Sequence, residues 1–96
     1  MTVSACSCAK TDTVWFSNIY SYSARVKWRA VSGASYYNVI ITDVADASGS
    51  QALFPSYATN VVVNKLKSKH TYKTVVQSIC QDMSVQSSTT YYFVTK

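Results

Sequence analysis

Residues 23–31, SARVKWRAV, alternate strictly between small or apolar residues and basic ones. Successive side chains of an extended strand point to opposite faces, so every second position shares a face. Such a strand is half-buried in an antiparallel sheet, with one face on a core and the other in water. The expected inward residues are Ala24, Val26, Trp28 and Ala30, and the outward ones are Arg25, Lys27 and Arg29.

The rest of the chain has the same bias toward strands. Its 96 residues include no Glu and only two Leu, whereas Val, Thr, Ser and Tyr are abundant. Strand-forming residues therefore outweigh helix formers, and an all-β fold is expected. The length suits one domain with a single core. No segment reaches the ~18 apolar residues of a membrane helix, so no membrane insertion is expected.

Seven segments have strand character and are separated by polar turns, the pattern of a seven-stranded antiparallel β-sandwich. Residues 43–52 are expected to form a loop and residues 81–86 a turn. Residues 1–12 are interpreted as a lead-in segment and residues 13–96 as the domain. The expected strands are residues 14–19, 23–31, 36–42, 53–55, 60–66, 71–80 and 89–94.

The position of a tryptophan separates two sandwich families. An immunoglobulin domain has cysteines in its second and sixth strands and a tryptophan on the third. Here Trp28 lies on the second expected strand, which has no cysteine. Two groups of residues instead resemble the fibronectin type III pattern over residues 13–95. They are Trp28, Gly33-Ala34, Tyr37 and Val39, and then Leu66, Tyr72, Thr74, Val76 and Ser78.

The resemblance has two departures and several implications. The proline common in the turn after Leu66 is absent, and Thr74 replaces an apolar residue. The implied topology is the immunoglobulin-like fold of fibronectin type III domains. The hydroxyl of Tyr72, the tyrosine after that turn, should form a hydrogen bond with the backbone near the turn. The other implied core residues are Trp28, Tyr37, Leu66 and Val76.

Three cysteines, Cys6, Cys8 and Cys80, allow one disulfide and leave one thiol over. This usage suits an oxidising compartment. The resemblance implies the pairing Cys8–Cys80, with Cys6 as the alternative partner. A zinc site of these cysteines with His70 is disfavoured, because His70 and Cys80 would lie at opposite ends of one strand.

No catalytic group is evident in the sequence, and no cofactor is expected. The only histidine, His70, falls in a predicted turn, and the acids Asp12, Asp43, Asp46 and Asp82 all fall in predicted loops. Catalysis needs a nucleophile, a base or paired acids placed together, and no acid–base pair is suggested here. The chain is therefore predicted not to be an enzyme.

Two surfaces are candidate binding faces. Apolar patches often mark protein interfaces, and one is expected on the sheet of the third, sixth and last strands, made of Tyr36, Ile40, Val75, Ile79 and Tyr92. The net charge of +5 permits binding of a polyanion such as an acidic polysaccharide. The residues for that role are Arg25, Lys27, Arg29, Lys65 and Lys67.

These features favour a protein-binding or spacer module from a larger secreted or cell-surface protein, with an unidentified protein partner. Residues 1–10 lack the apolar core of a signal peptide, which favours a segment of a longer precursor. One alternative is an accessory module of a secreted carbohydrate-active enzyme, and another is a polyanion-binding module. Nucleic acid is not an expected partner.

Overall fold

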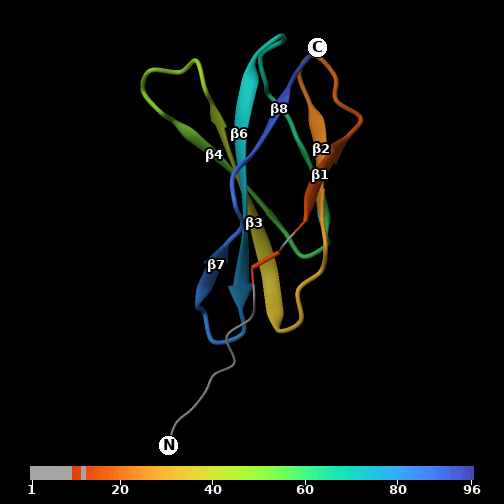
Figure 1. Ribbon diagram of the computed structural model, residues 1–96, viewed down its shortest axis with the longest axis vertical. Helices are drawn as coiled ribbons and strands as arrows, with labels where there is room; N and C mark the ends of the chain where they lie inside the picture. The colour runs from red at the N-terminus through yellow and green to blue at the C-terminus, as the bar shows by residue number, and fades with distance from the viewer. Residues whose placement is uncertain (1–9, 12) are drawn as a thin grey trace, which may run out of the picture.

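The computed structural model describes residues 10, 11 and 13–96, which form two antiparallel sheets (Figure 1). The described strands are β1 (Val14–Ser17), β2 (Ala24–Trp28), β3 (Ala34–Asp43), β4 (Gln51–Ser56), β5 (Asn60–Val63), β6 (Thr71–Cys80), β7 (Val85–Ser87) and β8 (Tyr91–Val94). No helix long and apolar enough to cross a membrane occurs in this part of the chain.

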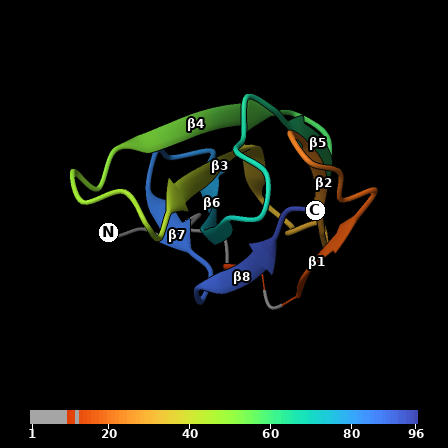
Figure 2. The ribbon, with the colours of Figure 1, turned by 90° about the horizontal axis from the view of Figure 1, so that it is seen from above.

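The two sheets pack face to face as a sandwich. One sheet has the strand order β1-β2-β5, and the other has the order β4-β3-β6, with β7 and β8 both pairing with β6. Viewed end-on, β1, β2 and β5 lie on one side and β3, β4, β6, β7 and β8 on the other (Figure 2). The predicted all-β sandwich is therefore confirmed, although eight strands are described where seven were expected.

The extra strand arises because the last expected strand is divided. β7 pairs with Gln77–Ile79 of β6, whereas β8 pairs with Thr71–Thr74. Between them, the Ser88 N–H donates to the Val76 carbonyl at 2.8 Å, and the Val76 N–H donates to Ser88 Oγ at 3.0 Å. The Ser88 side chain thus takes the place of a backbone carbonyl as the acceptor for the Val76 N–H. The turn expected at residues 81–86 includes the start of β7.

Several strand ends also differ from the expected ones. β2 ends at Trp28, so Ala30 lies outside it and is exposed rather than buried. β4 is longer than residues 53–55 and continues through Pro55, which an edge strand tolerates because its outer N–H positions need no partner. β5 ends at Val63, which places Leu66 in the following corner.

Aromatic side chains link the two sheets in the core. Trp28 of β2 meets Tyr37 of β3 edge-on at a ring distance of 5.3 Å. Phe93 of β8 lies 4.9 Å from Phe16 of β1 and stacks on Tyr72 of β6 at 5.6 Å. The expected core residues Trp28, Tyr37, Leu66, Tyr72 and Val76 are all buried.

Candidate functional site

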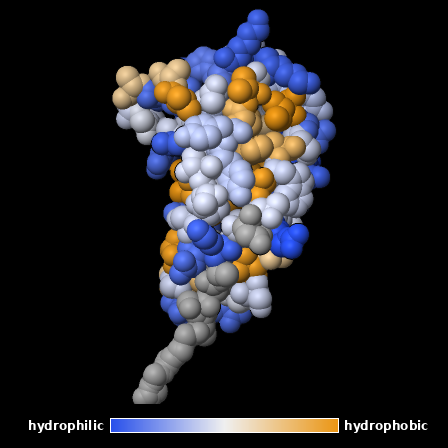
Figure 3. Space-filling view, in the orientation of Figure 1, coloured by the Kyte–Doolittle hydropathy of each residue, from blue (hydrophilic) through white to orange (hydrophobic). Residues whose placement is uncertain are grey.

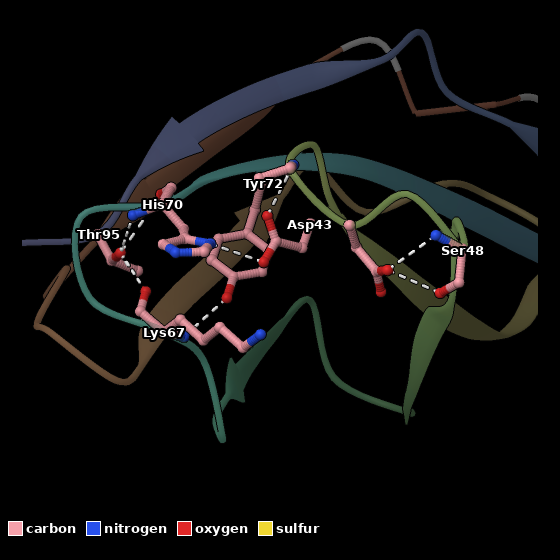
Figure 4. A network of polar contacts seen from close by, with 8 residues as sticks. Asp43, Ser48, Lys67, His70, Tyr72 and Thr95 are labelled. Carbon is pink, nitrogen blue, oxygen red and sulfur yellow. Dashed lines mark hydrogen bonds and ion pairs between the residues drawn. The ribbon is translucent and has the colours of Figure 1, made fainter.

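The corner between β5 and β6 is held by a tyrosine hydroxyl. Tyr72, at the start of β6, has a buried ring, and its hydroxyl accepts a hydrogen bond from the Lys67 N–H at 2.7 Å. Thr95, after β8, donates its hydroxyl to the Lys67 carbonyl at 2.5 Å and accepts the His70 N–H at 3.0 Å. Figure 4 shows these contacts, which fix the backbone of residues 67–70.

The same corner contains an acid–imidazole pair that the sequence did not suggest. Nδ1 of His70 lies 2.7 Å from Oδ2 of Asp43, the last residue of β3 (Figure 4). Antiparallel pairing of β3 with β6 places Asp43 opposite Tyr72, two residues from His70. The prediction that no acid–base pair would form is therefore corrected.

Asp43 is ionised more readily than an ordinary aspartate. Burial opposes its ionisation, but hydrogen bonds from the Ala45 N–H and the His70 ring, together with the charges of His70 and Lys67, outweigh that effect. The pKa of Asp43 is consequently lowered. Catalysis would also need a nucleophile at the second ring nitrogen, and within residues 10, 11 and 13–96 no side chain hydrogen-bonds there.

A crevice of about 430 Å³ opens beside this corner, between β4 and the loop after β5. Its floor is apolar, formed by Ile41, Phe54, Leu66 and Tyr72. Its rim is polar and of mixed charge, with Asp43, Asp46, Lys65 and Lys67 among the lining residues. Two acids and two lysines give the rim no net charge, so it favours neither anions nor cations.

The outer face of the five-stranded sheet carries a continuous apolar row. Leu53 of β4 lies opposite Ile40 of β3, and Ile40 lies opposite Val75 of β6. Leu53 is 57 % exposed, and Ile40 and Val75 are half-buried. We call Leu53, Ile40 and Val75 the apolar row. Polar pairs flank it on both sides, with Thr42 opposite Lys73 and Asn38 opposite Gln77.

The structure distributes the expected interface residues unevenly around this row. Tyr92 is exposed on β8, and Tyr36 is half-buried and contacts the ring of Tyr57 at 5.6 Å. Ile79 was expected to be exposed but is only 4 % exposed. It lies on the central strand between Tyr36 on β3 and Val85 on β7, which flank it on both sides. Ile79 therefore does not belong to the accessible face.

A shallow groove of about 390 Å³ runs along the apolar row. Ile40 and Val75 lie in its floor, and its walls are polar, including Gln51, Lys73 and Ser87. The groove follows the break between β7 and β8, since Ser88 and Thr90 also line it. An apolar floor with hydrogen-bonding walls suits a polypeptide segment better than a small ion.

The basic residues are divided between β2 and the segment that follows β5. Arg25 and Lys27 are outward and half-buried on β2, and Arg29 follows the end of that strand. Lys65 and Lys67 lie past β5, where Lys67 lines the crevice and lowers the pKa of Asp43 through its charge. Hydrophilic residues gather at the end of the molecule that carries the C-terminus (Figure 3).

The cysteines are only partly within the described structure. Cys80 ends β6 and is fully buried. Cys8 and Cys6 lie outside the described residues, so the pairing Cys8–Cys80 stays a prediction. His70 precedes the ten-residue β6 and Cys80 ends it, which separates them by about 30 Å of strand. No cluster of three metal-ligating side chains occurs within residues 10, 11 and 13–96.

The sequence did not identify two residues, Leu53 and Trp15, as part of the exposed surfaces. Leu53 was assigned to a short edge strand, but its membership of the apolar row depends on the register between β3 and β4. Trp15 was assigned to a strand, but the side of the sheet to which it points was not predicted. The register with β2 places it opposite Lys27 on the outer surface. The only available signal was that both are large apolar residues beside polar neighbours.

No family model matches the chain, and a search of curated proteins finds no matching sequence. Solved structures do match. The FN3 domain of human collagen XX is 18 % identical, with a TM-score of 0.78 over 91 % of this chain and 90 % of that one. The FN5 domain of Drosophila Lar is 15 % identical, with a TM-score of 0.75 over 91 % of this chain and 95 % of that one. The chain has the fibronectin type III fold.

A third structure, described as a myokine, is 13 % identical, with a TM-score of 0.79 over 92 % of this chain and 98 % of that one. At identities this low, the structural similarity establishes the fibronectin type III fold alone. The binding partners of those proteins are not assigned to this chain. The fold places the corner tyrosine, the apolar row and the basic strand β2 on three separate parts of the sandwich. A shared fold does not by itself specify a function.

Proposed function

We propose that this domain is a non-enzymatic protein-binding module of a larger secreted or cell-surface protein, and that it binds its partner through the apolar row. The observation that carries the proposal is the alignment of Leu53, Ile40 and Val75 in one register across three strands. Apolar side chains left in contact with water on a rigid sheet favour association, because burying them releases that surface from water.

The surroundings of the row also suit a protein partner. Polar groups on both sides provide hydrogen bonds at the rim of an interface, where such groups are tolerated because water still reaches them. Tyr92 lies opposite Lys73 at one end of the face and is exposed. Tyrosine suits this position, since it adds a large contact area with few rotatable bonds.

The structural role of the acid–imidazole pair supports the non-enzymatic part of the proposal. His70 and Asp43 connect the end of β3 to the start of β6, and the backbone beside them is fixed by Thr95 and Tyr72. Asp43 also accepts the N–H of Ala45 in its own turn. Both acceptor oxygens of Asp43 are thus engaged in holding loops, which is a structural role.

A disulfide between Cys8 and Cys80 forms part of the proposal and points to an oxidising compartment. Two observations support it. Cys80 is fully buried at the end of β6. Thr11, close to the proposed partner in sequence, is buried and donates its hydroxyl to the Arg29 carbonyl at 3.0 Å. Thr11 is therefore held against the sandwich.

Photo-crosslinking tests the proposed face directly. Benzoylphenylalanine would replace Leu53 in the row and, as a matched control, Met83, which is exposed in the turn after β6. Each variant is illuminated with the extracellular and cell-surface fractions of its source. We expect a defined protein adduct from position 53 and none from position 83. Adducts from neither position would favour a spacer role.

Substitution at a second row position keeps this test specific. Val75→Lys should abolish the adduct from position 53, because a charge at the centre of the row cannot be buried without cost. Val62→Lys makes the same change at an outward position of the other sheet and should leave the adduct unchanged. Loss of the adduct with both variants would mean that the row is not the binding face.

A further inference from the structure

A polar hollow of about 210 Å³ lies at one end of β2, on the sheet away from the apolar row. It is lined by residues of the loop between β1 and β2 and by residues of β2 and β5. These residues are Asn18, Tyr20, Ser23, Ala24, Arg25 and Val62. The hollow is small and rimmed by hydrogen-bonding groups, as expected for a pocket that accepts one polar ring.

Arg25 supplies a positive charge to this hollow that no described acid neutralises. Its Nη1 donates to Oδ1 of Asn60 at 2.7 Å, a neutral partner that orients the guanidinium. Within residues 10, 11 and 13–96 the one ion pair is that of His70 with Asp43. Of the described aspartates, Asp43 ends β3, and Asp46 and Asp82 lie in the loops after β3 and β6 of the other sheet. Arg25 thus keeps donors for an anionic ligand.

The positive charge continues along the same face. Lys27 points outward two residues after Arg25, and both are half-buried. A partly buried cation is held in place, so it loses less conformational freedom when it binds an anion than a lysine on an exposed loop. The spacing of two residues in a strand separates these charges by about 7 Å. A ligand with repeated negative charges can meet both at once.

Aromatic rings stand at both ends of this basic strip. Tyr20 lines the hollow and is 56 % exposed, with its hydroxyl 3.5 Å from Nδ2 of Asn18. Trp15 lies directly opposite Lys27 in the sheet and is 45 % exposed. Exposed aromatic faces present flat apolar surfaces on which the C–H face of a sugar ring can pack.

The geometry points to an acidic polysaccharide bound along β2, with one acidic sugar in the hollow and its charged group on Arg25. Lys27 would meet the next acidic group, and Trp15 would pack against a ring further along. Lys67 is not part of this site, because it lines the crevice beside Asp43 and Asp46. The site is independent of the apolar row, since the two lie on different sheets.

Isothermal titration with a heparin hexasaccharide tests the assignment. Arg25→Gln should weaken binding about tenfold or more, the effect of losing one charge-assisted hydrogen bond. It should also reduce the slope of log affinity against log salt by about one. Tyr20→Ala should weaken binding without changing the slope, because tyrosine is uncharged. Near-ultraviolet circular dichroism of each variant verifies folding.

Two controls make the outcome decisive. Lys73→Gln removes an exposed cation from the other sheet and should leave binding unchanged. An oligothymidylate of equal charge should bind more weakly than the hexasaccharide and be insensitive to Tyr20→Ala. The assignment is overturned if wild-type protein does not bind, if Lys73→Gln acts like Arg25→Gln, or if the oligonucleotide binds equally well.

Discussion

Nδ1 of His70 and Oδ2 of Asp43 lie 2.7 Å apart, joining two residues that are 27 positions apart in the chain. The contact ties the end of β3 to the corner before β6, where Tyr72 and Thr95 also hold the backbone. Asp43 ends a strand that carries the apolar row, so the corner and the candidate binding face share one rigid element.

Acid should weaken this corner. The pKa of Asp43 is lowered in the folded protein, so its ionised form stabilises the fold above the unfolded pKa of about 3.9. That contribution is lost as the pH falls through the lower folded pKa. Asp43→Asn should therefore reduce the loss of stability below about pH 4, measured as the urea midpoint against pH. An unchanged pH profile would contradict this role for Asp43.

Loss of the corner hydroxyl should destabilise the domain. Tyr72→Phe leaves the Lys67 N–H without its acceptor, and an unpaired donor of this kind costs about 1–2 kcal/mol. The free energy of unfolding in urea measures the effect. Tyr57→Phe provides the control, because Tyr57 is 87 % exposed and its loss of a hydroxyl should change little. Equal effects of both substitutions would argue against the corner bond.

Replacing threonine by valine should have opposite effects at two buried positions. Thr74 is fully buried, and its Oγ1 has no hydrogen-bond partner, so Thr74→Val should stabilise by about 1 kcal/mol. Thr95 is also buried, but its hydroxyl bonds to Lys67 and His70, so Thr95→Val should destabilise. Thermal unfolding of both variants gives the signs. Destabilisation by Thr74→Val would reveal a hidden partner of its hydroxyl.

The two tryptophans should differ strongly in their contribution to stability. Trp28 is 2 % exposed and packs against Tyr37 across the core, so Trp28→Ala should cost about 3–5 kcal/mol. Trp15 is half exposed on the outer surface, and Trp15→Ala should cost much less. Chemical denaturation compares the two. A large cost at Trp15 would show that it supports the fold and is not free for a ligand.

Peptide mapping without reduction should recover Cys8 linked to Cys80. In the chain-entropy model, closing so long a loop stabilises by up to about 4 kcal/mol. Cys8→Ser should therefore lower the melting temperature substantially, whereas Cys6→Ser should leave it nearly unchanged. Recovery of a Cys6–Cys80 peptide would reassign the pair, and labelling of Cys80 in native protein would exclude a disulfide there.

Local patterns explain why much of the fold could be predicted. The alternation around Trp28 requires one buried face, and the spacing of Leu66 and Tyr72 fits one turn between two strands. β6 has the bounds that the sequence indicated, because its apolar positions and flanking turns are unambiguous. The divided last strand was not predictable, since it depends on Ser88 reaching the N–H of Val76 across the sheet.

The sequence by itself determined the fold class and the inward faces of the main strands, because these follow from residue preferences and from periodicity over a few neighbouring residues, whereas the corner role of Tyr72 followed from the resemblance to fibronectin type III domains. Tertiary structure decided which side chains lie next to one another on the surface. The register of three strands aligned Leu53 with Ile40 and Val75, buried Ile79 between its neighbours and brought Asp43 to His70. Register depends on contacts between distant segments, and a slip of one residue would turn every side chain to the opposite face.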